Sequence, residues 1–440
     1  MVNPVAGLGG RVGLGGTDGP ERARLAVSLG ARPLAGVRAG AALGELGVRV
    51  GEVGLAGGEL AGPGLVTRER PGAGARSGVV ASAAASGAVT AEAAFAPAST
   101  GAPSSADATA TGPAVAQAFA PGLLVITAAG PLGADSVAAS GLPARIVYAA
   151  RGARDTSAAD TAAAVRAIVA EGIDLLLFAG GDGTARDVLT ALGDMACPVL
   201  GVPTGVKMHS AVFAVSPRAA GEVAAAWLTR KGAVRLRDAE VMDRDEDALS
   251  KGRVTSRLFG WLPVPDLPVR VQQRKTGSTA TAPGAVGGIA AEVAERVGDD
   301  LLVLGPGSTT RAVAAALGAD VSLTGVDVLR LRAGHPPRVV ACEATEDTLL
   351  ALGPAWIALS PIGGQGFLLG RGNQQVSPRV LRAAGGLERL LVVCTEQKLA
   401  ALGGRPLLVD SGDEALDAEL CGHLPVITGR CRTSLYRLAM

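Results

Sequence analysis

One short segment constrains the fold of this 440-residue chain more than any other. Residues 173–179 (IDLLLFA) form an apolar run typical of a buried parallel strand, the pentad GGDGT follows at 180–184, and a helix is expected over 185–192. A second apolar run, PVLGV, occupies 198–202. This order of strand, loop, helix and strand predicts an α/β fold with a doubly wound parallel sheet, which binds its ligands at the carboxyl ends of the strands.

The same alternation of strands and helices recurs elsewhere in the chain. A helix is expected over 157–171, with Asp155 or Thr156 as its N-cap and Gly172 at its end. Residues 235–280 carry β-branched runs and several prolines, which favours a second domain of mixed or mostly β structure. Further strand candidates are 123–127, 144–148, 301–305, 356–360, 390–394 and 406–409, and a further helix is expected over 311–317.

These elements suggest three regions. We expect an α/β nucleotide-binding domain over 1–212, a β-rich or mixed domain over 213–380, and a C-terminal α/β segment over 381–440 that packs back on the first domain. Residues 71–121 are rich in Ala, Gly, Ser, Thr and Pro and have few large apolar side chains. We interpret them as a low-complexity insertion.

Charge and composition exclude several classes of protein. The 41 basic residues are balanced by 40 acidic ones and aromatics make up 2%, so nucleic acid is not an expected partner. Prolines interrupt the charge-poor stretch around 108–134, so no membrane-spanning helix is expected. The five cysteines form no CxxC pair, and no secretory signal is visible at the start. These features predict a cytoplasmic protein with reduced thiols.

The pentad has the composition of a phosphate site. Gly180, Gly181 and Gly183 let backbone amides approach an anion, and the helix that follows adds the partial positive charge of its N-terminus. A carboxylate such as Asp182 would repel a phosphate, so simple anion binding does not explain its presence. Its presence is explained if it takes a proton from an attacking hydroxyl or holds Mg²⁺. The alternative is a glycine-rich turn with an Asx-type aspartate. The chain has neither a GxxxxGK[ST] loop nor a GxGxxG motif in a clean β-α-β unit.

Two other segments contain candidates for substrate binding. Lys207 and His209 lie just after the second apolar run, where Lys207 could balance triphosphate charge, although a solvated lysine beside a packed histidine fits equally well. The glycine-rich segment 361–375 brings together donors and amides suited to a phosphate or carboxylate. A contact between domains or subunits would use the same donors, which are Gln365, Arg371, Asn373, Gln374 and Gln375.

Several of these motifs resemble one superfamily. GGDGT after an apolar strand, PVLGVPTG at 198–205 and the opening NPVAG at 3–7 are similar to motifs of the NAD kinase superfamily, which includes phosphofructokinase-like and diacylglycerol-kinase-like enzymes. Four longer motifs resemble the bacterial ATP-NAD kinase-like family that includes acetoin-catabolism protein X. These motifs are FAGGDGTARD (178–187), GVKMHSAVFA (205–214), GPGSTTRA (305–312) and PIGGQGFLLGRGNQQ (361–375).

The resemblance implies a fold and a set of roles. It implies a Rossmann-like parallel sheet in the N-terminal domain and a second, β-rich or mixed domain. Asp182 would be the catalytic acid/base for the 2′-hydroxyl of the NAD ribose, with Mg²⁺ nearby. The residues that would hold nucleotide phosphates are Asn3, Gly180, Gly181, Gly183, Thr184, Gly307, Ser308, Thr309 and Thr310. The Asn-Glu/Asp pair that grips the nicotinamide ribose in ordinary NAD kinases has no clear counterpart here.

The implied activity is that of an ATP-dependent NAD kinase forming NADP, with ATP or polyphosphate as donor and Mg²⁺ or another divalent cation as cofactor. Its expected partners are small-molecule nucleotides and further copies of itself in a homo-oligomer. One alternative is a kinase of the same fold that acts on another small hydroxylated metabolite, linked to acetoin catabolism. Another is a nucleotide-binding regulatory protein without turnover.

Overall fold

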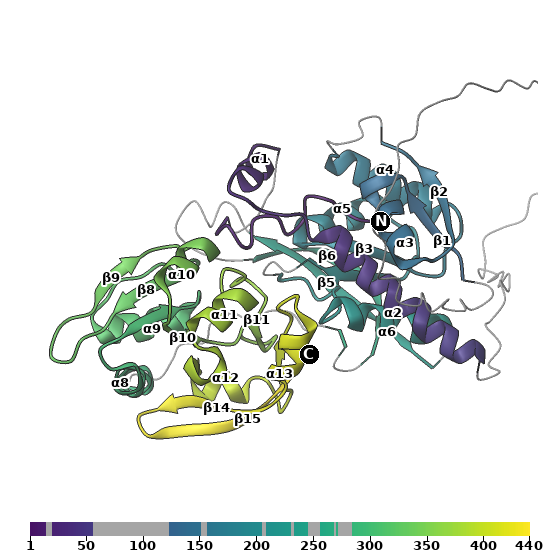
Figure 1. The fold of residues 1–440 in the computed structure, drawn as a ribbon. Helices are drawn as coiled ribbons and strands as arrows, with labels where there is room; N and C mark the ends of the chain where they lie inside the picture. The colour runs from purple at the N-terminus through teal and green to yellow at the C-terminus, as the bar shows by residue number, and fades with distance from the viewer. Residues whose placement is uncertain are drawn as a thin grey trace, which may run out of the picture. The chain divides into compact units, whose positions relative to one another are not determined.

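A computed structural model describes residues 1–14, 20–55, 123–150, 156–204, 208–229, 233–244, 256–267, 270–271 and 284–440 (Figure 1). All of them belong to one compact unit, formed by Met1–Ala61 together with Phe119–Met440. The expected insertion at 71–121 lies outside the described residues. The described part is an α/β protein with parallel strand pairs, as the alternation in the sequence predicts.

The N-terminal half contains two parallel strand pairs. Strand β1 (Val125–Ala128) pairs with β2 (Ala144–Tyr148), and β3 (Leu176–Gly180) pairs with β4 (Val199–Pro203). Val2 makes a parallel bridge to Ala179, so the first residues lie along β3. The helices of this half are α1 (Pro20–Ser28), α2 (Ala35–Leu55), α3 (Ala134–Ser140), α4 (Ala158–Val169), α5 (Asp182–Leu192) and α6 (Pro217–Thr229), with a 3₁₀ turn, η1, at Gly130–Leu132.

Helix α4 shows how local sequence sets an element boundary. Its N-cap is Ser157, whose side chain accepts from the Asp160 amide, while the Asp160 carboxylate accepts from the Ser157 amide. This reciprocal capping satisfies two N–H groups that the helix itself leaves without partners. The expected N-cap, Asp155 or Thr156, is therefore wrong by one or two residues. Near the other end, Gly172 has φ of +72°, a conformation that favours glycine.

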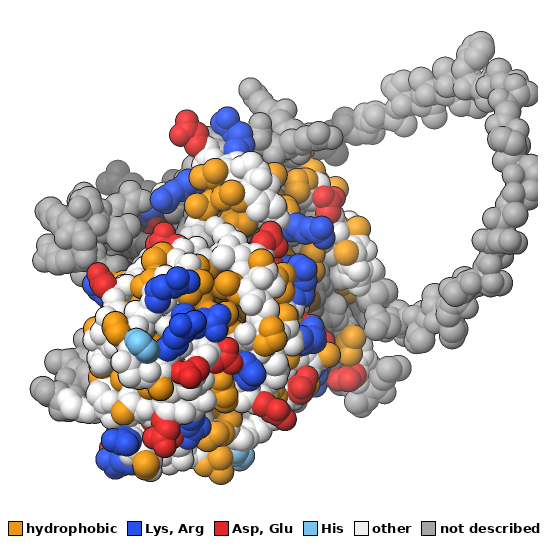
Figure 2. All heavy atoms as spheres, turned by 60° about the vertical axis from the view of Figure 1, so that its left-hand side comes forward, with side chains coloured by type: hydrophobic (Ala, Val, Ile, Leu, Met, Phe, Trp, Pro, Cys, Tyr) orange, Lys and Arg blue, Asp and Glu red, His pale blue; other side chains and the backbone are white. Residues whose placement is uncertain are grey.

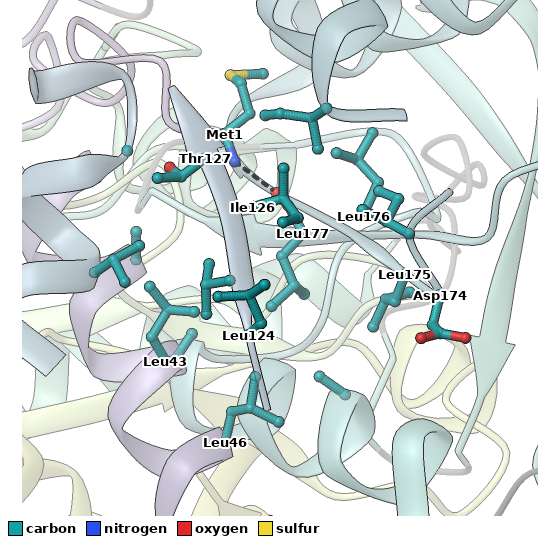
Figure 3. A pocket seen from close by; sticks show the side chains of 18 of the residues that line it. Met1, Leu43, Leu46, Leu124, Ile126, Thr127, Asp174, Leu175, Leu176 and Leu177 are labelled. Atoms are coloured by element: carbon teal, nitrogen blue, oxygen red, sulfur yellow. Dashed lines mark hydrogen bonds between the residues drawn. The ribbon is translucent and has the colours of Figure 1, made fainter. Parts of the chain in front are cut away.

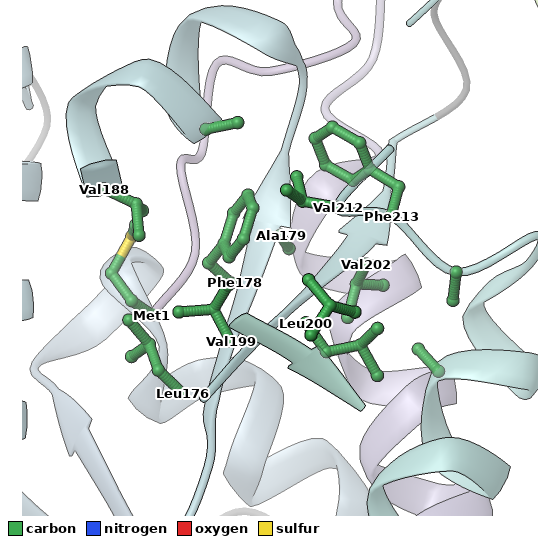
Figure 4. Close-up of a cluster of buried hydrophobic side chains, with 14 of the residues drawn as sticks. Met1, Leu176, Phe178, Ala179, Val188, Val199, Leu200, Val202, Val212 and Phe213 are labelled. Carbon is green, nitrogen blue, oxygen red and sulfur yellow. The ribbon is translucent and has the colours of Figure 1, made fainter. Parts of the chain in front are cut away.

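Buried aliphatic and aromatic side chains fill the space beside β3 and β4. Phe178 and Phe213 pack edge to face with ring centroids 5.4 Å apart, and Figure 4 shows Leu200 and Val202 in the same cluster. A Cβ at Gly201 would lie 2.3 Å from the Phe213 ring. The strand therefore needs glycine at this position to let the ring approach.

The region 235–280 contains the expected β structure. Strands β5 (Arg235–Arg244) and β6 (Ser256–Asp266) form an antiparallel pair.

The C-terminal half is built on a nine-stranded mixed sheet in the order β11-β13-β15-β14-β12-β10-β7-β8-β9. Its strands are β7 (Leu301–Leu304), β8 (Asp327–Arg330), β9 (Arg338–Ala341), β10 (Trp356–Leu359), β11 (Phe367–Leu369), β12 (Leu390–Val393), β13 (Leu407–Val409), β14 (Gly422–Gly429) and β15 (Arg432–Ala439). The boundary expected at residue 380 falls inside this sheet, because β12 pairs with β10 and β13 pairs with β11. Residues 381–440 are thus part of the second sheet.

Two apolar clusters lie against this sheet. One contains side chains of α8 (Ala285–Val297) and α9 (Ser308–Leu317). The other contains side chains of α10 (Glu346–Leu352), α11 (Pro378–Ala384), α12 (Glu396–Ala400) and α13 (Glu414–Leu420), and η2 is a 3₁₀ turn at Gly386–Arg389. Each cluster buries residues from β7, β10 and β12, which explains why these strands read as continuous apolar runs.

A buried ionic cluster joins the two halves. Asp410, just after β13, accepts from Arg38 of α2 at 2.7 Å and from Arg371 at 2.8 Å. Arg38 also donates to the Pro203 carbonyl and Arg371 to the Val215 carbonyl. Burial lowers the pKa of the Arg371 guanidinium to about 10, against the opposing effect of Asp410. One carboxylate thus compensates two buried cations.

The surface carries charges of both signs. Figure 2 shows Lys and Arg side chains interspersed with Asp and Glu side chains on the face that it presents. This agrees with the near balance of 41 basic and 40 acidic residues. Among the helices in the described ranges, none combines the length and the hydropathy that a membrane crossing requires.

Removal of the shared carboxylate should destabilise the protein strongly. Asp410→Asn leaves Arg38 and Arg371 buried without a counter-charge, so we expect a loss of about 3–5 kcal/mol in the free energy of unfolding. Denaturant unfolding followed by circular dichroism measures it. The matched control is Asp320→Asn, which removes an exposed carboxylate 3.9 Å from Arg311 and should cost less than about 1 kcal/mol. Equal losses in the two variants would contradict the importance of the cluster.

Candidate active site

The pentad forms a tighter turn than the sequence suggests. Strand β3 ends at Gly180, Gly181 is the N-cap in an extended conformation, and α5 begins at Asp182. The Ala185 amide donates to the Gly181 carbonyl at 3.0 Å, which closes the first helical turn. The helix therefore starts three residues before the expected Ala185. Asp182, Gly183 and Thr184 lie in its first turn and not in a loop.

Gly180 is required by the packing of this turn. A Cβ at Gly180 would lie 2.4 Å from the Thr184 side chain, which is itself buried. The Thr204 hydroxyl, directly after β4, donates to the Gly180 carbonyl at 3.0 Å. Strands β3 and β4 are thus tied together at their carboxyl ends, which is where a doubly wound sheet binds ligands.

The N-terminal segment lies against the pentad, as its motif suggests. Asn3 Nδ2 donates to Thr184 Oγ1 at 2.9 Å, and the Asn3 amide donates to the Ala179 carbonyl. Gly7 has φ of +80°, and a Cβ there would lie 2.4 Å from the Thr204 carbonyl oxygen. The structure therefore brings Asn3 and Thr184 together with the pentad, and their phosphate-binding role stays a prediction.

Asp182 is buried and hydrogen-bonded on both oxygens. Oδ2 accepts from the His209 amide at 2.7 Å and lies 3.1 Å from His209 Nδ1. Oδ1 accepts from the Ser210 amide at 3.0 Å and from the Ser210 hydroxyl at 2.6 Å. A carboxylate offers about four acceptor positions; donors of these two residues occupy three of them, and the His209 ring nitrogen, whose role depends on its tautomer, lies beside the carboxylate. A substrate hydroxyl or a metal ion would have to replace at least one of these contacts.

Ser210 is a site residue that sequence analysis missed. Its hydroxyl oxygen lies 2.8 Å from the Met242 carbonyl and accepts from the Met242 amide at 3.0 Å, so it connects Asp182 to β5. The available signal was the polar pair His209-Ser210 inside an otherwise apolar run. His209 is 2% exposed and packs against the carboxylate, and Lys207 lies outside the described residues.

The candidate side chains in 361–375 mainly form hydrogen bonds and ion pairs with other segments of the protein. Gln365 Nε2 donates to the Met208 carbonyl at 2.9 Å, and Arg371 belongs to the buried ionic cluster. Asn373 closes its own loop through the Gly370 amide and the Leu368 carbonyl. These contacts favour the alternative of an internal contact between segments. Gln374 Nε2 and Gln375 Oε1 are buried and have no hydrogen-bond partner among the described residues, as is also the case for Nε and Nη1 of Arg371.

A second polar site follows β7. Gly307, with φ of +139°, is the N-cap of α9, and Thr310 Oγ1 donates to its carbonyl. Lys398 Nζ donates to Thr309 Oγ1 at 3.2 Å and to Ser360 Oγ at 2.9 Å. Ser308 is the first residue of α9. This arrangement places a cation beside a helix N-terminus, which suits an anionic group.

Lys398 and Ser360 were also missed in the sequence. Ser360 directly follows β10, and Lys398 lies five residues after the end of β12. Because β7, β10 and β12 are parallel neighbours, their carboxyl ends share one edge of the sheet. The signal that could have found both residues was therefore their position just after predicted strands.

Metal-binding side chains are sparse in the described ranges. No group of three or more His, Cys, Asp or Glu side chains is placed there to hold a metal ion. A cation at the pentad would therefore need oxygens from a bound ligand or from water.

Comparison with family models gives two matches. The model of the ATP-NAD kinase N-terminal domain matches residues 115–232, and that of the ATP-NAD kinase C-terminal domain matches residues 298–438. The first match includes the pentad with His209 and Ser210, and the second includes the 307–310 turn and Lys398. Searches of curated proteins and of solved structures found no match.

Substitution of Gly180 tests the packing of the pentad. Gly180→Ala forces Thr184 to move, so we expect a loss of about 1–3 kcal/mol in the free energy of unfolding. The same substitution at Gly44, in the middle of α2 with open space around it, should stabilise by about 0.5–1 kcal/mol. Thermal and denaturant unfolding of both variants measures whether the free energy of unfolding falls in one and rises in the other. A stabilising Gly180→Ala would show that the turn has room for a side chain.

Proposed function

Because the chain belongs to the ATP-NAD kinase family, we propose that it is an ATP-dependent NAD kinase. In this reaction the γ-phosphoryl group of ATP passes to the 2′-hydroxyl of the NAD adenosine ribose and gives NADP. The observation that carries the proposal is the position of Asp182, a buried carboxylate in the first turn of α5 at the carboxyl end of β3. Phosphate groups and a hydroxyl acceptor can both approach such a position.

The first turn of α5 supplies the anion-binding part of the site. The first four N–H groups of a helix have no partner within it, and the helix dipole favours negative charge there. Glycines at positions 180, 181 and 183 remove side chains from this approach. Asn3 contributes an amide group that now donates to Thr184 and lies within reach of the same turn.

Asp182 would accept the proton of the attacking hydroxyl. The ribose oxygen forms its bond to the γ-phosphorus while the bond from that phosphorus to the β,γ-bridging oxygen breaks, and ADP leaves. The transition state of such a transfer is loose and depends on positioning and on charge stabilisation. The proton moves to a carboxylate oxygen of Asp182, which His209 and Ser210 hold in a fixed orientation.

One hydrogen bond must open before Asp182 can act in this way. The Ser210 hydroxyl is the best candidate, because its oxygen lies 2.6 Å from Asp182 Oδ1 and 2.8 Å from the Met242 carbonyl. Rotation of the hydroxyl proton toward Met242 frees an acceptor position on Oδ1 and breaks no backbone hydrogen bond. The substrate hydroxyl would then take the place of the serine proton.

We propose Mg²⁺ or another divalent cation as the cofactor. When bound, it would neutralise charge on the transferring phosphates. Magnesium usually takes one or two carboxylates and completes its shell with phosphate oxygens and water. Asp182 fits this pattern as the carboxylate at the pentad, and the cation would arrive with ATP.

A second candidate function follows from the same carboxylate. Donors of His209 and Ser210 engage both oxygens of Asp182 within the protein, which favours a nucleotide-binding protein without turnover. A kinase with another hydroxylated acceptor is also open, because the sequence has no clear counterpart of the pair that grips the nicotinamide ribose.

Asp182→Asn separates a catalytic role from a structural one. We expect NADP formation to fall by at least about 100-fold, because the amide cannot accept the hydroxyl proton as a base. The variant should also lose about 1–3 kcal/mol of stability, because an amide group faces donors of His209 or Ser210. Turnover is therefore measured per folded molecule, with the folded fraction determined by circular dichroism.

The matched control is Glu292→Gln. Glu292 is equally buried, at 8% exposure, and accepts from Arg296 and from the Cys431 amide, neither of which belongs to the pentad or to the 307–310 turn. It should lose stability but keep its turnover per folded molecule. Equal losses of turnover in the two variants would remove the catalytic assignment of Asp182.

An ATP-consumption assay on the purified protein with Mg²⁺ distinguishes the three functions. An NAD kinase consumes ATP only when NAD is added and releases NADP in equal amount. A kinase for another acceptor consumes no additional ATP with NAD but does so with its own hydroxylated substrate. A regulatory protein binds ATP, measured by calorimetry, and consumes none with any acceptor. The first result is the one we expect.

A further inference from the structure

A cavity of about 410 Å³ lies where α2 and the start of α6 meet the segments 370–377 and 409–417. A volume of this size is typical of small-molecule sites. None of the described residues that line it belongs to the pentad, to the 208–210 segment or to the 307–310 turn. We call it the arginine pocket, because its described lining includes Arg11, Arg38, Arg49, Arg218 and Arg270.

The cavity between β1 and β3 has a different charge. Figure 3 shows Leu43 and Leu46 of α2 beside it and Asp174 at one end. Its volume is about 320 Å³, and the charged side chains among its described lining residues, Glu171 and Asp174, are both acidic. An anion would therefore find a cationic side chain at the arginine pocket and not in this cavity.

The walls of the arginine pocket are largely aliphatic. Val37 and Ala41 come from α2, Leu34 precedes this helix, and Val376 and Val409 come from the C-terminal half. Val37 is 72% exposed and Ala41 is exposed as well, so this part of the wall is in contact with solvent. An apolar ligand group that covers it would remove apolar surface from water, which favours binding.

The acidic side chains inside the pocket already have partners in the protein. Asp410 accepts from Arg38 at 2.7 Å, and both residues line the pocket. Asp417 accepts from the Ser411 amide on both carboxylate oxygens at 3.1 Å. Glu414 is exposed at the start of α13. The donors that bind these carboxylates weaken their repulsion of an anion in the pocket.

Arg218 has only distant carboxylate partners. Its Nε atom lies 3.6 Å from Glu45 and 3.7 Å from Glu222. Each of these carboxylates has a closer arginine, since Arg49 lies 2.8 Å from Glu45 and Arg270 lies 2.7 Å from Glu222. Arg218 also lies in the first turn of α6, where a cation opposes the helix dipole. An anion beside Arg218 would compensate both the guanidinium and the helix end.

The spacing along α2 sets the shape of the ligand. Arg218 lies beside Glu45, and Val37 is eight residues earlier on the same helix. At 1.5 Å per residue this separation is about 12 Å along the helix axis. Ala41 lies between the two positions and lines the pocket. A ligand that reaches from the guanidinium to Val37 therefore needs an elongated apolar body with a charge at one end.

We propose that the arginine pocket binds an amphipathic monocarboxylate of medium chain length, with its carboxylate at Arg218 and its chain along Ala41 and Val37. One guanidinium matches the single charge of a carboxylate and binds it through two parallel hydrogen bonds. The ligand would contact both halves of the protein, because Val376 and Val409 also line the pocket. The proposal does not depend on the proposed kinase activity.

Calorimetry with sodium octanoate on the full chain tests the site. We expect one octanoate per chain with a dissociation constant below about 1 mM. Acetate has the charge without the chain, and 1-octanol has the chain without the charge, so each should bind at least about tenfold more weakly. Saturating octanoate should also raise the melting temperature by about 2 °C or more, because it binds the folded state alone.

Substitutions at exposed positions test the two ends of the ligand. Arg218→Ala removes the cation and should weaken octanoate binding at least about tenfold, whereas Arg218→Lys keeps the charge and should weaken it less. Ala41→Phe fills the space along α2 and should also weaken binding at least about tenfold. The matched control is Arg432→Ala, which removes an exposed arginine 2.8 Å from Glu396 and should leave octanoate binding unchanged. Circular dichroism shows whether each variant is folded.

Weaker binding in Arg218→Ala and Ala41→Phe alone supports the site. The proposal fails if octanoate does not bind, or if 1-octanol binds as tightly, since the pocket is then an apolar cavity only. It also fails if acetate binds as tightly as octanoate, or if Arg218→Ala binds octanoate as tightly as the unchanged chain. Equal weakening by Arg432→Ala would likewise overturn it. NADP formation in the absence of octanoate bears only on the kinase proposal.

Discussion

The geometry of the candidate site depends on the Asp182 carboxylate and its bonds to two consecutive residues. Four contacts from His209 and Ser210 fix the start of α5 against the segment that follows β4, and Ser210 carries the connection on to β5. Gly180 and Thr184 pack tightly because this helix begins so close to its strand. Loss of the carboxylate would release the helix N-terminus, the 208–210 segment and β5 together. The residue to which we assign the proton transfer is thus also a structural anchor.

The parts of the fold that the sequence predicts well are the strands buried on both faces. β3, β4, β7, β10 and β12 read as short apolar runs because helices or clusters cover both sides of them. The β14–β15 hairpin was not predicted, since many of its residues are exposed and its polar positions hide the period of two. The start of α5 was placed three residues late, because tertiary hydrogen bonds to Asp182 stabilise a first turn that contains glycine.

The sequence predicted where the candidate site lies better than it predicted which hydrogen bonds its residues make. Asn3 and the pentad lie together because Asn3 follows Val2, which makes a parallel bridge to β3, and the pentad begins at the end of β3. Residue type alone did not reveal that Gln365 and Arg371 use their donors on backbone carbonyls of a distant segment. Ser210, Ser360 and Lys398 were overlooked because serine and lysine are common on any surface. Their significance comes from the strand ends beside them, which only a three-dimensional arrangement brings into view.

The end of β4 has a consequence for how the protein unfolds. The Pro203 carbonyl accepts from Arg38, which binds Asp410 at the end of β13, and the next residue, Thr204, donates to the Gly180 carbonyl of the pentad. Two adjacent residues, Pro203 and Thr204, therefore connect the nine-stranded sheet to the candidate site. Thermal unfolding of the nine-stranded sheet would remove Asp410 from Arg38, and unfolding around β4 would remove the Pro203 carbonyl from the same arginine. We therefore expect the two halves to unfold as a single cooperative unit. Ligand binding at the pentad would then protect the distant sheet from proteolysis as well as the site itself.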